Sequence, residues 1–542
     1  MKALDLLERA ETRRQEAVGD LDASKQSEFG QFFTPEQAAS LIAGLVQLPR
    51  GGTFRVLDPG AGSGILSAAL VSRVLMERPE LALEIVAVEI DERLGSHLAA
   101  TLDECEEEAS LAGCQLTTRI VQADLLAMAT GLALEVPPLA EPFDVVIMNP
   151  PYGKLAASSW QRRSLSMLGV QCPNLYAAFL AIGTTMLRPG GQLVAITPRS
   201  FANGPYFGQF RRWLLDRVAL SHIHVFASRS TVFSDAGVLQ ENVVFAATRG
   251  ATPSEVTLST SNGHRDTRSE RVVQYCDVVE PGDPLGFIRI ATNDVDTSIA
   301  KVLGDLPCSL ADLDLSVSTG RVVDFRVRAH LLEGPQNNSV PLIYPANLVA
   351  GSVSWPRLGK KPQAIARAKE TEQLFLPNEH YVIVKRFSSK EERRRVVAAV
   401  HEPLTFDATE VAFENHLNVF HMRNRGMAPG LAWGLTCWLN SALVDRFFRT
   451  FSGHTQVNAT DLRSLRYPSL SLLLRLGSEV ESARVVDQDD IDDLVDRVIL
   501  STTTTQSARV PTTGRCRRSA RPWNSSNSLG STPNVQMIAQ RS

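Results

Sequence analysis

The chain has 542 residues and a mass of 59.2 kDa, enough for two or three domains that each bury a hydrophobic core. Hydrophobic residues make up 44% and charged residues 21%, and 35 glycines and 29 prolines are an ordinary share, so collagen-like and wholly disordered proteins are excluded. The formal net charge of −4 gives no sign of a polyanionic partner when the chain is taken as a whole.

No run approaches roughly 18 consecutive apolar residues, so no membrane-spanning helix is expected. The N-terminus is charged and helical in pattern, and it lacks the apolar stretch and the cleavage site of a secretion signal. The seven cysteines are scattered, and no two are spaced as Cys-x-x-Cys. This pattern argues against a disulfide framework and against a structural zinc site, so we expect a cytoplasmic protein without a metal.

The first predicted element is an amphipathic helix over residues 3–18, within an N-terminal helical segment 1–28. From about residue 54 to residue 248, short β-rich apolar runs alternate with helical stretches such as 64–76 and 175–187. The predicted strands are 54–57, 84–88, 118–121, 143–148, 192–197, 220–226 and 243–247. This alternation predicts a Rossmann-like α/β domain over residues 29–250, with a mostly parallel seven-stranded sheet covered on both faces.

The second half of the chain has a different pattern. Residues 251–285 are polar and predict a linker, and residues 286–500 combine short β runs, Pro/Gly turns and helices, which predicts an α+β domain. An acidic helical stretch covers 484–499. The tail 501–542 has six arginines, no acid and no periodicity, so we expect it to be disordered. We hypothesise that this tail does not belong to the ancestral domain.

Charge is unevenly distributed along the chain. Residues 101–150 contain one arginine and nine acids, whereas residues 151–200 contain five Lys/Arg and no acid. Residues 351–400 contain eleven Lys/Arg and five acids. Two basic zones in an otherwise acidic protein favour one face that meets a polyanion. For either zone alone, a solvated charged surface is an equally good interpretation.

A glycine-rich turn, DPGAGSG at residues 58–64, follows the first predicted strand and precedes a predicted helix. Glycines at this place let the backbone turn tightly and approach a ligand at the helix N-terminus. The turn is not the dinucleotide fingerprint, because Ile65 stands where GxGxxG needs glycine, and no GxxxxGK[ST] phosphate loop occurs. The turn alone is weak evidence of function, since many α/β folds have one.

Acidic residues end the next two predicted strands. Glu89 follows the run Val86-Ala87-Val88, and Asp124 closes the third strand. A carboxylate at the first position can accept hydrogen bonds from both hydroxyls of a ribose. The second can accept one from an adenine amino group, so together they suit an adenosine ligand without phosphate. For either acid taken alone, a solvated strand end is the favoured interpretation.

The fourth predicted strand runs directly into Asn149-Pro150-Pro151-Tyr152. Two consecutive prolines remove two backbone donors and stiffen the turn. They would hold the Asn149 side chain and the Pro150 carbonyl at the carboxyl edge of the sheet, where open α/β sheets bind ligands. A plain proline turn after a core strand is disfavoured, because the other strand-end residues come in a matching order.

With this motif the sequence resembles the gamma class of DNA adenine-N6 methyltransferases of restriction–modification systems. The motif order of that class is present: GQFFTP at 30–35, then the glycine turn, the strand-end acids and NPPY, followed by a C-terminal target-recognition domain. The resemblance covers about residues 29–250 with high specificity. Segments 317–321 and 452–458 extend it at lower specificity to type II modification methylases of the BsuBI/PstI type.

The resemblance implies a class I methyltransferase domain that binds S-adenosyl-L-methionine, and it implies a role for each matching residue. Glu89 would hold the cofactor's ribose, Asp124 its adenine amino group, and Pro151 would pack against it. The remaining residues implied at the cofactor are Phe33, Thr34, Asp58, Pro59, Gly60, Ala61 and Gly62. No metal is implied.

The catalytic group implied by the resemblance is Asn149, Pro150, Tyr152 and Phe233. The Asn149 side chain and the Pro150 carbonyl would accept hydrogen bonds from the exocyclic amine of the target adenine, whose lone pair is delocalised and poorly nucleophilic. Tyr152 and Phe233 would stack on the base, which must leave the duplex to react. A core position is the alternative for Phe233.

The resemblance implies double-stranded DNA as the partner and, functionally, a cognate restriction endonuclease. In the second domain we expect DNA contacts from 355–361, Lys385–Phe387, Lys390 and Arg393–Arg395, where cations and aromatics alternate. Thr455, Gln456 and Asn458 belong either to this surface or to a structural polar turn. Two alternatives for the whole chain remain: a methyltransferase of the same fold that acts on RNA or protein, and a non-catalytic DNA-binding subunit.

Overall fold

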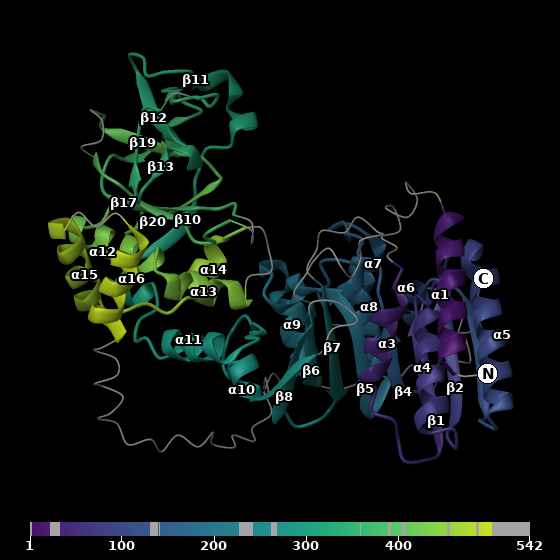
Figure 1. Ribbon diagram of the computed structural model, residues 1–542. Helices are drawn as coiled ribbons and strands as arrows, with labels where there is room; N and C mark the ends of the chain where they lie inside the picture. The colour runs from purple at the N-terminus through teal and green to yellow at the C-terminus, as the bar shows by residue number, and fades with distance from the viewer. Residues whose placement is uncertain are drawn as a thin grey trace, which may run out of the picture.

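Figure 1 shows the computed structural model, in which the protein has two domains side by side. The residues that the structure describes are 3–21, 33–130, 139, 141–167, 169–226, 242–261, 268–357, 359–388, 392–403, 408–451, 456–483 and 487–500. The tail predicted to be disordered, 501–542, lies outside the described residues, as do Phe233, Lys390 and Thr455. No helix in the described ranges is long and apolar enough to cross a membrane.

The first domain is built on a nine-stranded sheet with the order β3-β2-β1-β4-β5-β7-β6-β8-β9. Its strands are β1 (Thr53–Pro59), β2 (Ala82–Glu89), β3 (Leu116–Gln122), β4 (Phe143–Met148), β5 (Leu187–Pro198), β6 (Val218–Phe226), β7 (Asn242–Arg249), β8 (Glu255–Ser261) and β9 (Ser269–Gln274). Strands β1 to β5 pair in parallel, and the only antiparallel pairs described are β5–β7, β6–β7 and β8–β9. The predicted mostly parallel α/β fold is therefore confirmed.

The predicted linker 251–285 is wrong in part, because this segment carries β8, β9 and helix α10 (Tyr275–Val278). Strand β8 pairs in parallel with β6, and β9 closes the edge, so the sheet has nine strands instead of seven. In β8, the buried side chains of Val256 and Leu258 alternate with more exposed ones. A strand with one solvated face is half polar, which is why composition made this segment resemble a linker.

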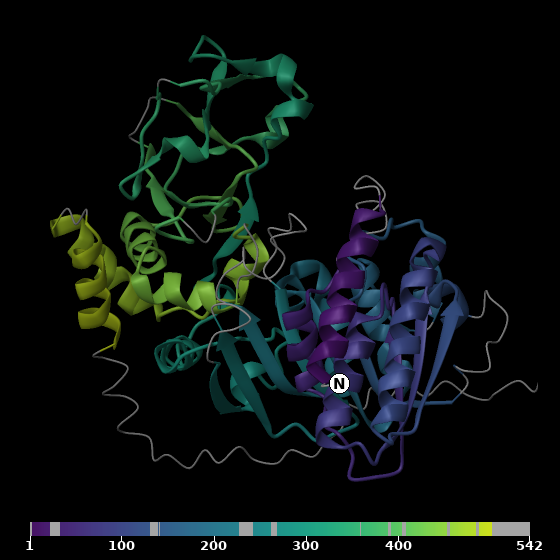
Figure 2. The ribbon, with the colours of Figure 1, turned by 45° about the vertical axis from the view of Figure 1, so that its right-hand side comes forward.

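Helices cover both faces of the sheet (Figures 1 and 2). One face packs against α1 (Ala3–Gly19), α3 (Glu36–Gly44), α4 (Ile65–Glu77) and α5 (Gly95–Leu111). The other packs against α6 (Leu125–Ala129), α7 (Trp160–Met167), α8 (Leu175–Met186), α9 (Gly208–Leu215) and α10. The N-terminal helix is part of this layer, because Leu6, Leu7 and Ala10 are buried in the core and Arg9 pairs with Glu104 of α5.

The second domain contains two further sheets. The six-stranded sheet has the order β10 (Ser316–Thr319), β20 (Leu417–His421), β17 (Tyr381–Lys385), β18 (Ala398–His401), β14 (Ser352–Val353) and β13 (Leu348–Val349). The five-stranded sheet has the order β11 (Leu331–Leu332), β15 (Ala364–Ala366), β12 (Ser339–Ile343), β19 (Glu410–Phe413) and β16 (Leu376–Pro377). Mixed pairing and short strands agree with the predicted α+β character of this half.

Helices complete the second domain: α11 (Asp294–Gly304), α12 (Pro429–Leu439), α13 (Ala442–Phe451), α14 (Ala459–Ser464), α15 (Leu470–Ala483) and α16 (Gln488–Val495). Helices α12 and α15 cross at two glycines that leave no room for a side chain. A Cβ at Gly434 would lie 1.8 Å from the carbonyl oxygen of Leu473, and one at Gly477 would lie 1.8 Å from that of Gly430. Glycine at both positions therefore allows the two backbones to touch.

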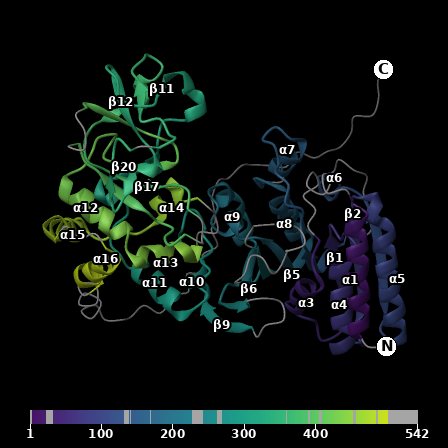
Figure 3. The ribbon, with the colours of Figure 1, turned by 45° about the horizontal axis from the view of Figure 1, so that its top comes forward.

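The second domain lies at the β8–β9 end of the large sheet, and α5 lies at the opposite end (Figures 1 and 3). The buried Arg199, in the 3-10 turn η3 (Arg199–Ala202) after β5, donates a hydrogen bond to the carbonyl of Thr450 in α13. Arg211 of α9 is fully buried and close enough to Asp461 of α14 to act on its carboxyl group. Buried arginines of the first domain thus position the second.

Candidate active site

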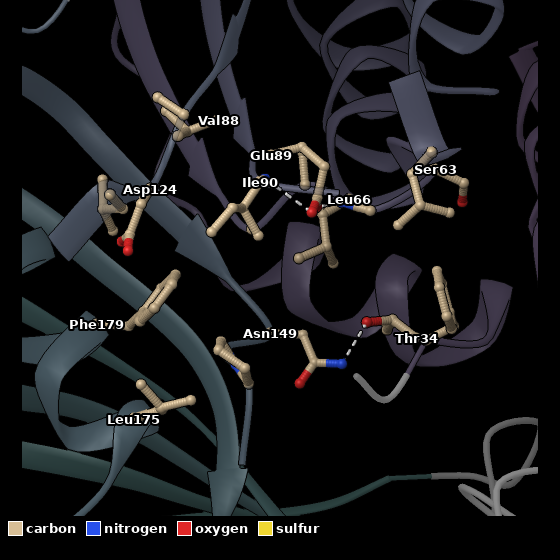
Figure 4. A pocket seen from close by; sticks show the side chains of 18 of the residues that line it. Thr34, Ser63, Leu66, Val88, Glu89, Ile90, Asp124, Asn149, Leu175 and Phe179 are labelled. Atoms are coloured by element: carbon tan, nitrogen blue, oxygen red, sulfur yellow. Dashed lines mark hydrogen bonds between the residues drawn. The ribbon is translucent and has the colours of Figure 1, made fainter. Parts of the chain in front are cut away.

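A cavity of about 270 Å³ opens where β1, β2, β3 and β4 end. Figure 4 shows it from close by, with Glu89, Asp124 and Asn149 arriving from three different strand ends. Its lining consists of Phe33, Thr34, Gly60, Ala61, Gly62, Ser63, Ile65, Leu66, Val88, Glu89, Ile90, Leu94, Ala123, Asp124, Leu125, Leu126, Asn149, Pro151, Gln161, Leu175 and Phe179. Most of the residues predicted at the cofactor therefore meet in one cavity. Asp58 and Pro59 do not line it.

The glycine turn forms one wall of the cavity. Gly60, Gly62 and Gly64 all have positive φ angles, 74°, 60° and 87°, which other residues adopt at a cost. The amides of Gly60 and Ala61 donate to the Val88 carbonyl at 2.7 and 3.0 Å, so the turn is bound to the end of β2. Helix α4 begins directly after the turn, which directs backbone N–H groups toward the cavity side of the sheet.

Glu89, at the end of β2, has its carboxylate fixed by the backbone. One oxygen accepts from the amides of Ile90 and Asp91, both at 2.9 Å, and the other accepts from Gly62 at 2.8 Å. Burial raises the pKa of this carboxyl, and the three hydrogen bonds from backbone amides oppose that shift. The sequence predicts that Glu89 binds the ligand. In the structure, Glu89 also holds the glycine turn in place through its hydrogen bond with the amide of Gly62.

Asp124 also has two functions in the structure. It is the N-cap of α6, and one carboxylate oxygen accepts from the amide of Leu126 at 2.8 Å. The second oxygen has no hydrogen-bond partner among the residues that the structure describes, and the residue lines the cavity beside Phe179 (Figure 4). A capped acid with one oxygen facing a cavity suits a ligand that donates a hydrogen bond.

Asn149 lines the cavity and comes directly after β4. Its side-chain nitrogen donates to the Thr34 hydroxyl at 3.0 Å (Figure 4). In this arrangement the amide nitrogen lies toward Thr34 and the oxygen is turned away from it. The Phe-Thr-Pro segment and the NPPY segment, more than a hundred residues apart, therefore meet through these two side chains. Pro151 lines the cavity and Pro150 is buried beside it.

Tyr152 faces other aromatic residues instead of the cavity. Its ring meets Tyr176 of α8 edge-to-face at 6.1 Å between centroids, and Tyr176 stacks on Phe207 at 5.3 Å. Burial raises the pKa of the Tyr152 hydroxyl, so the side chain is neutral and can offer an uncharged face. The predicted partner in stacking, Phe233, is outside the described residues, so its role stays a prediction.

Asp58 lies behind the glycine turn and is fully buried. Its carboxylate accepts from the Ser67 hydroxyl at 2.7 Å, while its other oxygen has no hydrogen-bond partner among the described residues. Burial raises the pKa of Asp58 to about 7, the Ser67 hydrogen bond opposes this shift, and the charge of Glu89 adds to it. We therefore interpret Asp58 as a residue that positions the turn from below.

Replacing Asp58 by asparagine should flatten the pH dependence of stability between about pH 4 and pH 7. The raised pKa of Asp58 means that the folded protein binds this proton more tightly than the unfolded chain does. Its contribution therefore favours folding at pH values below the ordinary carboxyl range, and is lost as the pH rises through about 7. Urea unfolding of the cofactor-free protein at several pH values measures this slope. The exposed Asp216→Asn is the control, and equal slopes for wild type and D58N would contradict the prediction.

Several lining residues were not found from the sequence. Phe179 lies on the apolar helix α8 and its ring lines the cavity beside Asp124 (Figure 4), where a Cβ on Gly60 would lie 3.5 Å from it. Ile90 is 50% exposed although it follows a buried strand. An isoleucine after a strand-end acid was a usable signal, because that position faces the same cavity. Among the described residues, no group of His, Cys, Asp or Glu could hold a metal.

One residue of the predicted basic zone in the second domain is used inside the fold. Arg395 is fully buried, its guanidinium donates to the Ser388 carbonyl, and its amide donates to Asp445. The predicted contact of Arg395 with DNA is therefore wrong. Arg394 donates to the Asn440 carbonyl and is only half-buried, and Arg393 is exposed, so their contacts with DNA stay predictions. Asn458 caps α14, in agreement with the structural alternative for that turn.

Comparison with known proteins gives consistent results. A model of the Eco57I restriction-modification methylase family matches residues 119–233. Type II methyltransferase M.BsuBI of Bacillus subtilis is 40% identical over 483 residues, which cover 88% of this chain and 95% of the relative. Type II methyltransferase M.PstI of Providencia stuartii is 38% identical over 487 residues, 89% of this chain and 95% of the relative.

Among solved structures, the type IIL restriction-modification enzyme MmeI in complex with DNA is similar in fold, with a TM-score of 0.51 and 12% identity over 93% of this chain and 77% of that chain. The predicted resemblance is confirmed by two relatives that align over nearly the whole of both chains. The chain therefore belongs to the family of type II restriction–modification methyltransferases that includes M.BsuBI and M.PstI.

Proposed function

We propose that the protein transfers a methyl group from S-adenosyl-L-methionine to N6 of an adenine in double-stranded DNA, and thereby protects host DNA from a cognate restriction endonuclease. The observation that carries the adenine assignment is the position of Asn149, which lines the cavity directly after β4. Its side-chain nitrogen donates to Thr34, and its oxygen, a hydrogen-bond acceptor, is turned away from Thr34. A hydrogen-bond acceptor at this place suits an amino group as the methyl acceptor.

The cavity fits S-adenosyl-L-methionine in its chemistry. Glu89 supplies a fixed carboxylate for the two ribose hydroxyls, and Asp124 supplies an acceptor for the adenine amino group. Ile90 and Phe179 supply apolar surface for the purine. Gly60 and Gly62, both with positive φ, leave space for the methionine part of the cofactor. A side chain at Gly60 would fill the space beside Phe179, and one at Gly62 the space beside Phe33. Among the described residues that line the cavity there is no lysine or arginine, which matches a nucleoside ligand without phosphate.

The reaction requires a stronger nucleophile than a free adenine offers. When bound, S-adenosyl-L-methionine supplies a methyl group on a positively charged sulfur. The Asn149 oxygen and the Pro150 carbonyl accept the two hydrogens of the exocyclic amine, which favours a pyramidal nitrogen. The lone pair of that nitrogen would then be directed at the methyl group of the bound cofactor, and the surplus proton of the amine would pass to water. Catalysis is therefore mainly positioning and electrostatics.

The target base must leave the duplex to reach Asn149, at a cost of about a few kcal/mol. Tyr152 offsets this cost by stacking on the base, and the aromatic partners Tyr176 and Phe207 hold its ring in place. Phe233 is the proposed second stacking residue. The Tyr176 hydroxyl is hydrogen-bonded to Ser200 at 2.9 Å, which ties this aromatic group to the segment after β5.

Contact with DNA is favoured by a surface of the second domain that we call the basic tip: Phe325, Arg326, Arg328, Lys360 and Lys361. All five are exposed, and Phe325 is 78% exposed, with the Arg326 guanidinium 5.6 Å from its ring centre. The ion pair of Lys361 with Asp324, at 3.3 Å, joins the two loops. The turns before β11 lie on the side of the second domain that faces the first (Figures 1 and 3).

Removing charge from the basic tip should weaken DNA binding. For the double variant Lys360→Ala/Lys361→Ala we expect an affinity loss of about tenfold or more at moderate salt, because each lost phosphate contact lowers the slope of log K against log salt by about 0.9. Fluorescence anisotropy with a labelled duplex at several salt concentrations measures the affinity and its salt dependence. The exposed Lys301→Ala in α11 should bind like wild type. An unchanged salt slope in the double variant would remove the basic tip from the interface.

The proposed function is tested by offering the purified protein labelled S-adenosyl-L-methionine together with duplex DNA, RNA or bacterial protein, and by digesting the DNA to nucleosides for mass spectrometry. We expect label in duplex DNA as N6-methyladenine. Label in cytosine, RNA or protein would overturn the assignment. Methylation sequencing of a genome from cells that express the protein would then report the sequence context, and resistance of that DNA to a matching endonuclease would test protection.

A further inference from the structure

Asn242, the first residue of β7, carries a buried amide that nothing in the described structure satisfies. The residue is 5% exposed, and neither its side-chain oxygen nor its nitrogen has a hydrogen-bond partner among the described residues. Leaving a buried amide unpaired normally destabilises a fold, so such groups usually serve a ligand or a functional need. Asn242 directly precedes the predicted strand 243–247, and the sequence alone predicts no role for it.

The sheet register places Asn242 on the same face as Asn149. In β4, Val145 and Ile147 pack in the core under α1, α3 and α4, whereas Val146 and Met148 pack on the opposite side. Strict alternation puts Asn149 on the α3 side, in agreement with its bond to Thr34. In β7, Val244 and Ala246 pack on that same side, and Val243 and Phe245 on the other. Asn242 therefore faces the α3 side as well.

The two amides lie close to one another across a single strand. Met148 pairs with Ala195 of β5, and Asn242 pairs with Pro198 of β5, so Asn149 and Asn242 flank the end of β5. With neighbouring strands about 4.8 Å apart and about 3.3 Å per residue, their Cα atoms are roughly 12 Å apart. That separation suits a purine with a hydrogen-bonding side chain at each of two edges.

We propose that the Asn242 side-chain amide donates a hydrogen bond to a ring nitrogen of the extruded target adenine, across the base from Asn149. An asparagine amide matches adenine, which offers ring nitrogens as acceptors. Asn242 does not line the cofactor cavity, so it is placed for the methyl acceptor and not for the donor. The inference rests on the proposed adenine-N6 activity and adds a residue that selects the base.

The test uses duplexes in which the target adenine is replaced by 1-deaza-, 3-deaza- or 7-deazaadenine, each lacking one ring acceptor but keeping the amine. We expect wild type to methylate one of them about 10–100-fold less efficiently (kcat/KM) than adenine, because one hydrogen bond to the amide is lost. In Asn242→Ala and Asn242→Leu, the efficiency on adenine should fall by a similar factor. In these variants the kcat/KM on adenine should lie within about threefold of the kcat/KM on that analogue.

Folding provides a second, independent readout. Asn242→Leu keeps the volume and removes the unpaired amide, so in the absence of DNA the variant should unfold at the same urea concentration as wild type or a higher one. Lower activity together with retained stability separates base recognition from a structural role. Wild type that discriminates against none of the analogues, or variants that keep its discrimination, would overturn the inference. Wild type that methylates no adenine at all would instead refute the proposed function.

Discussion

Replacing Asn149 by alanine should reduce the rate of methyl transfer to adenine by about 1000-fold, with little change in the affinity for S-adenosyl-L-methionine. The variant loses the hydrogen-bond acceptor that acts on the reacting amine. In other enzymes, deleting one side chain that hydrogen-bonds to the reacting group lowers kcat by about 10²–10³. Asn149 is one of many residues that line the cofactor cavity, whereas Glu89 and Asp124 are the residues proposed to hold the polar groups of the cofactor. Single-turnover kinetics on a short duplex, with calorimetry for the cofactor, separate the two effects.

Thr34→Val provides the matched control for this loss. It keeps the size of the side chain and removes the hydroxyl that accepts from the Asn149 nitrogen at 3.0 Å. Without that bond the amide can rotate, so the rate should fall by a smaller factor, about tenfold, from one neutral hydrogen bond. If Asn149→Ala methylated within tenfold of wild type, the acceptor role would be wrong. If Thr34→Val were as inactive as Asn149→Ala, Thr34 would act directly on a ligand and not through Asn149.

The parts of the site that lie at strand ends could be predicted from the sequence. Glu89 ends a run of buried apolar residues and Asn149 follows one, whereas Asp124 comes after the more exposed strand β3. All three are placed by strand ends, and the ends of parallel strands meet at one edge of a sheet. The strand periodicity alone therefore brings them together, whatever the loops do. The same argument failed for Phe179, because its place at the cavity depends on how α8 crosses the sheet, a tertiary contact that no local pattern encodes.

The errors of the sequence analysis have the same origin. A run of three arginines has the composition of a DNA contact, but Arg395 is used inside the second domain, where the Ser388 carbonyl receives its guanidinium group. The polar composition of 251–285 likewise hid β8, which pairs with a strand far earlier in the chain: Thr257 of β8 pairs with His222 of β6. Composition reports what a side chain can do, whereas burial decides whether it faces the solvent.

Glu89 links cofactor recognition to the shape of the glycine turn. Its carboxylate accepts three backbone amides, including that of Gly62, and faces the position proposed for the ribose. Replacing Glu89 by alanine should therefore weaken S-adenosyl-L-methionine binding by about 100-fold or more, since two hydrogen bonds to a charged acceptor are each worth about 1.5–3 kcal/mol. The variant should also be less stable, because the amides of Gly62, Ile90 and Asp91 lose their acceptor.

Glu89→Gln tests which property of the side chain matters. The amide keeps the shape but replaces one oxygen by an NH₂ group that faces a backbone donor, so we expect nearly the same loss of affinity as for alanine. The neighbouring exposed acid provides the control, and Glu92→Gln should bind the cofactor like wild type. Isothermal titration calorimetry gives both affinities, and urea unfolding gives the stabilities. Cofactor binding by Glu89→Ala within about threefold of wild type would show that the ribose is held elsewhere, and would leave Glu89 as a support for the turn alone.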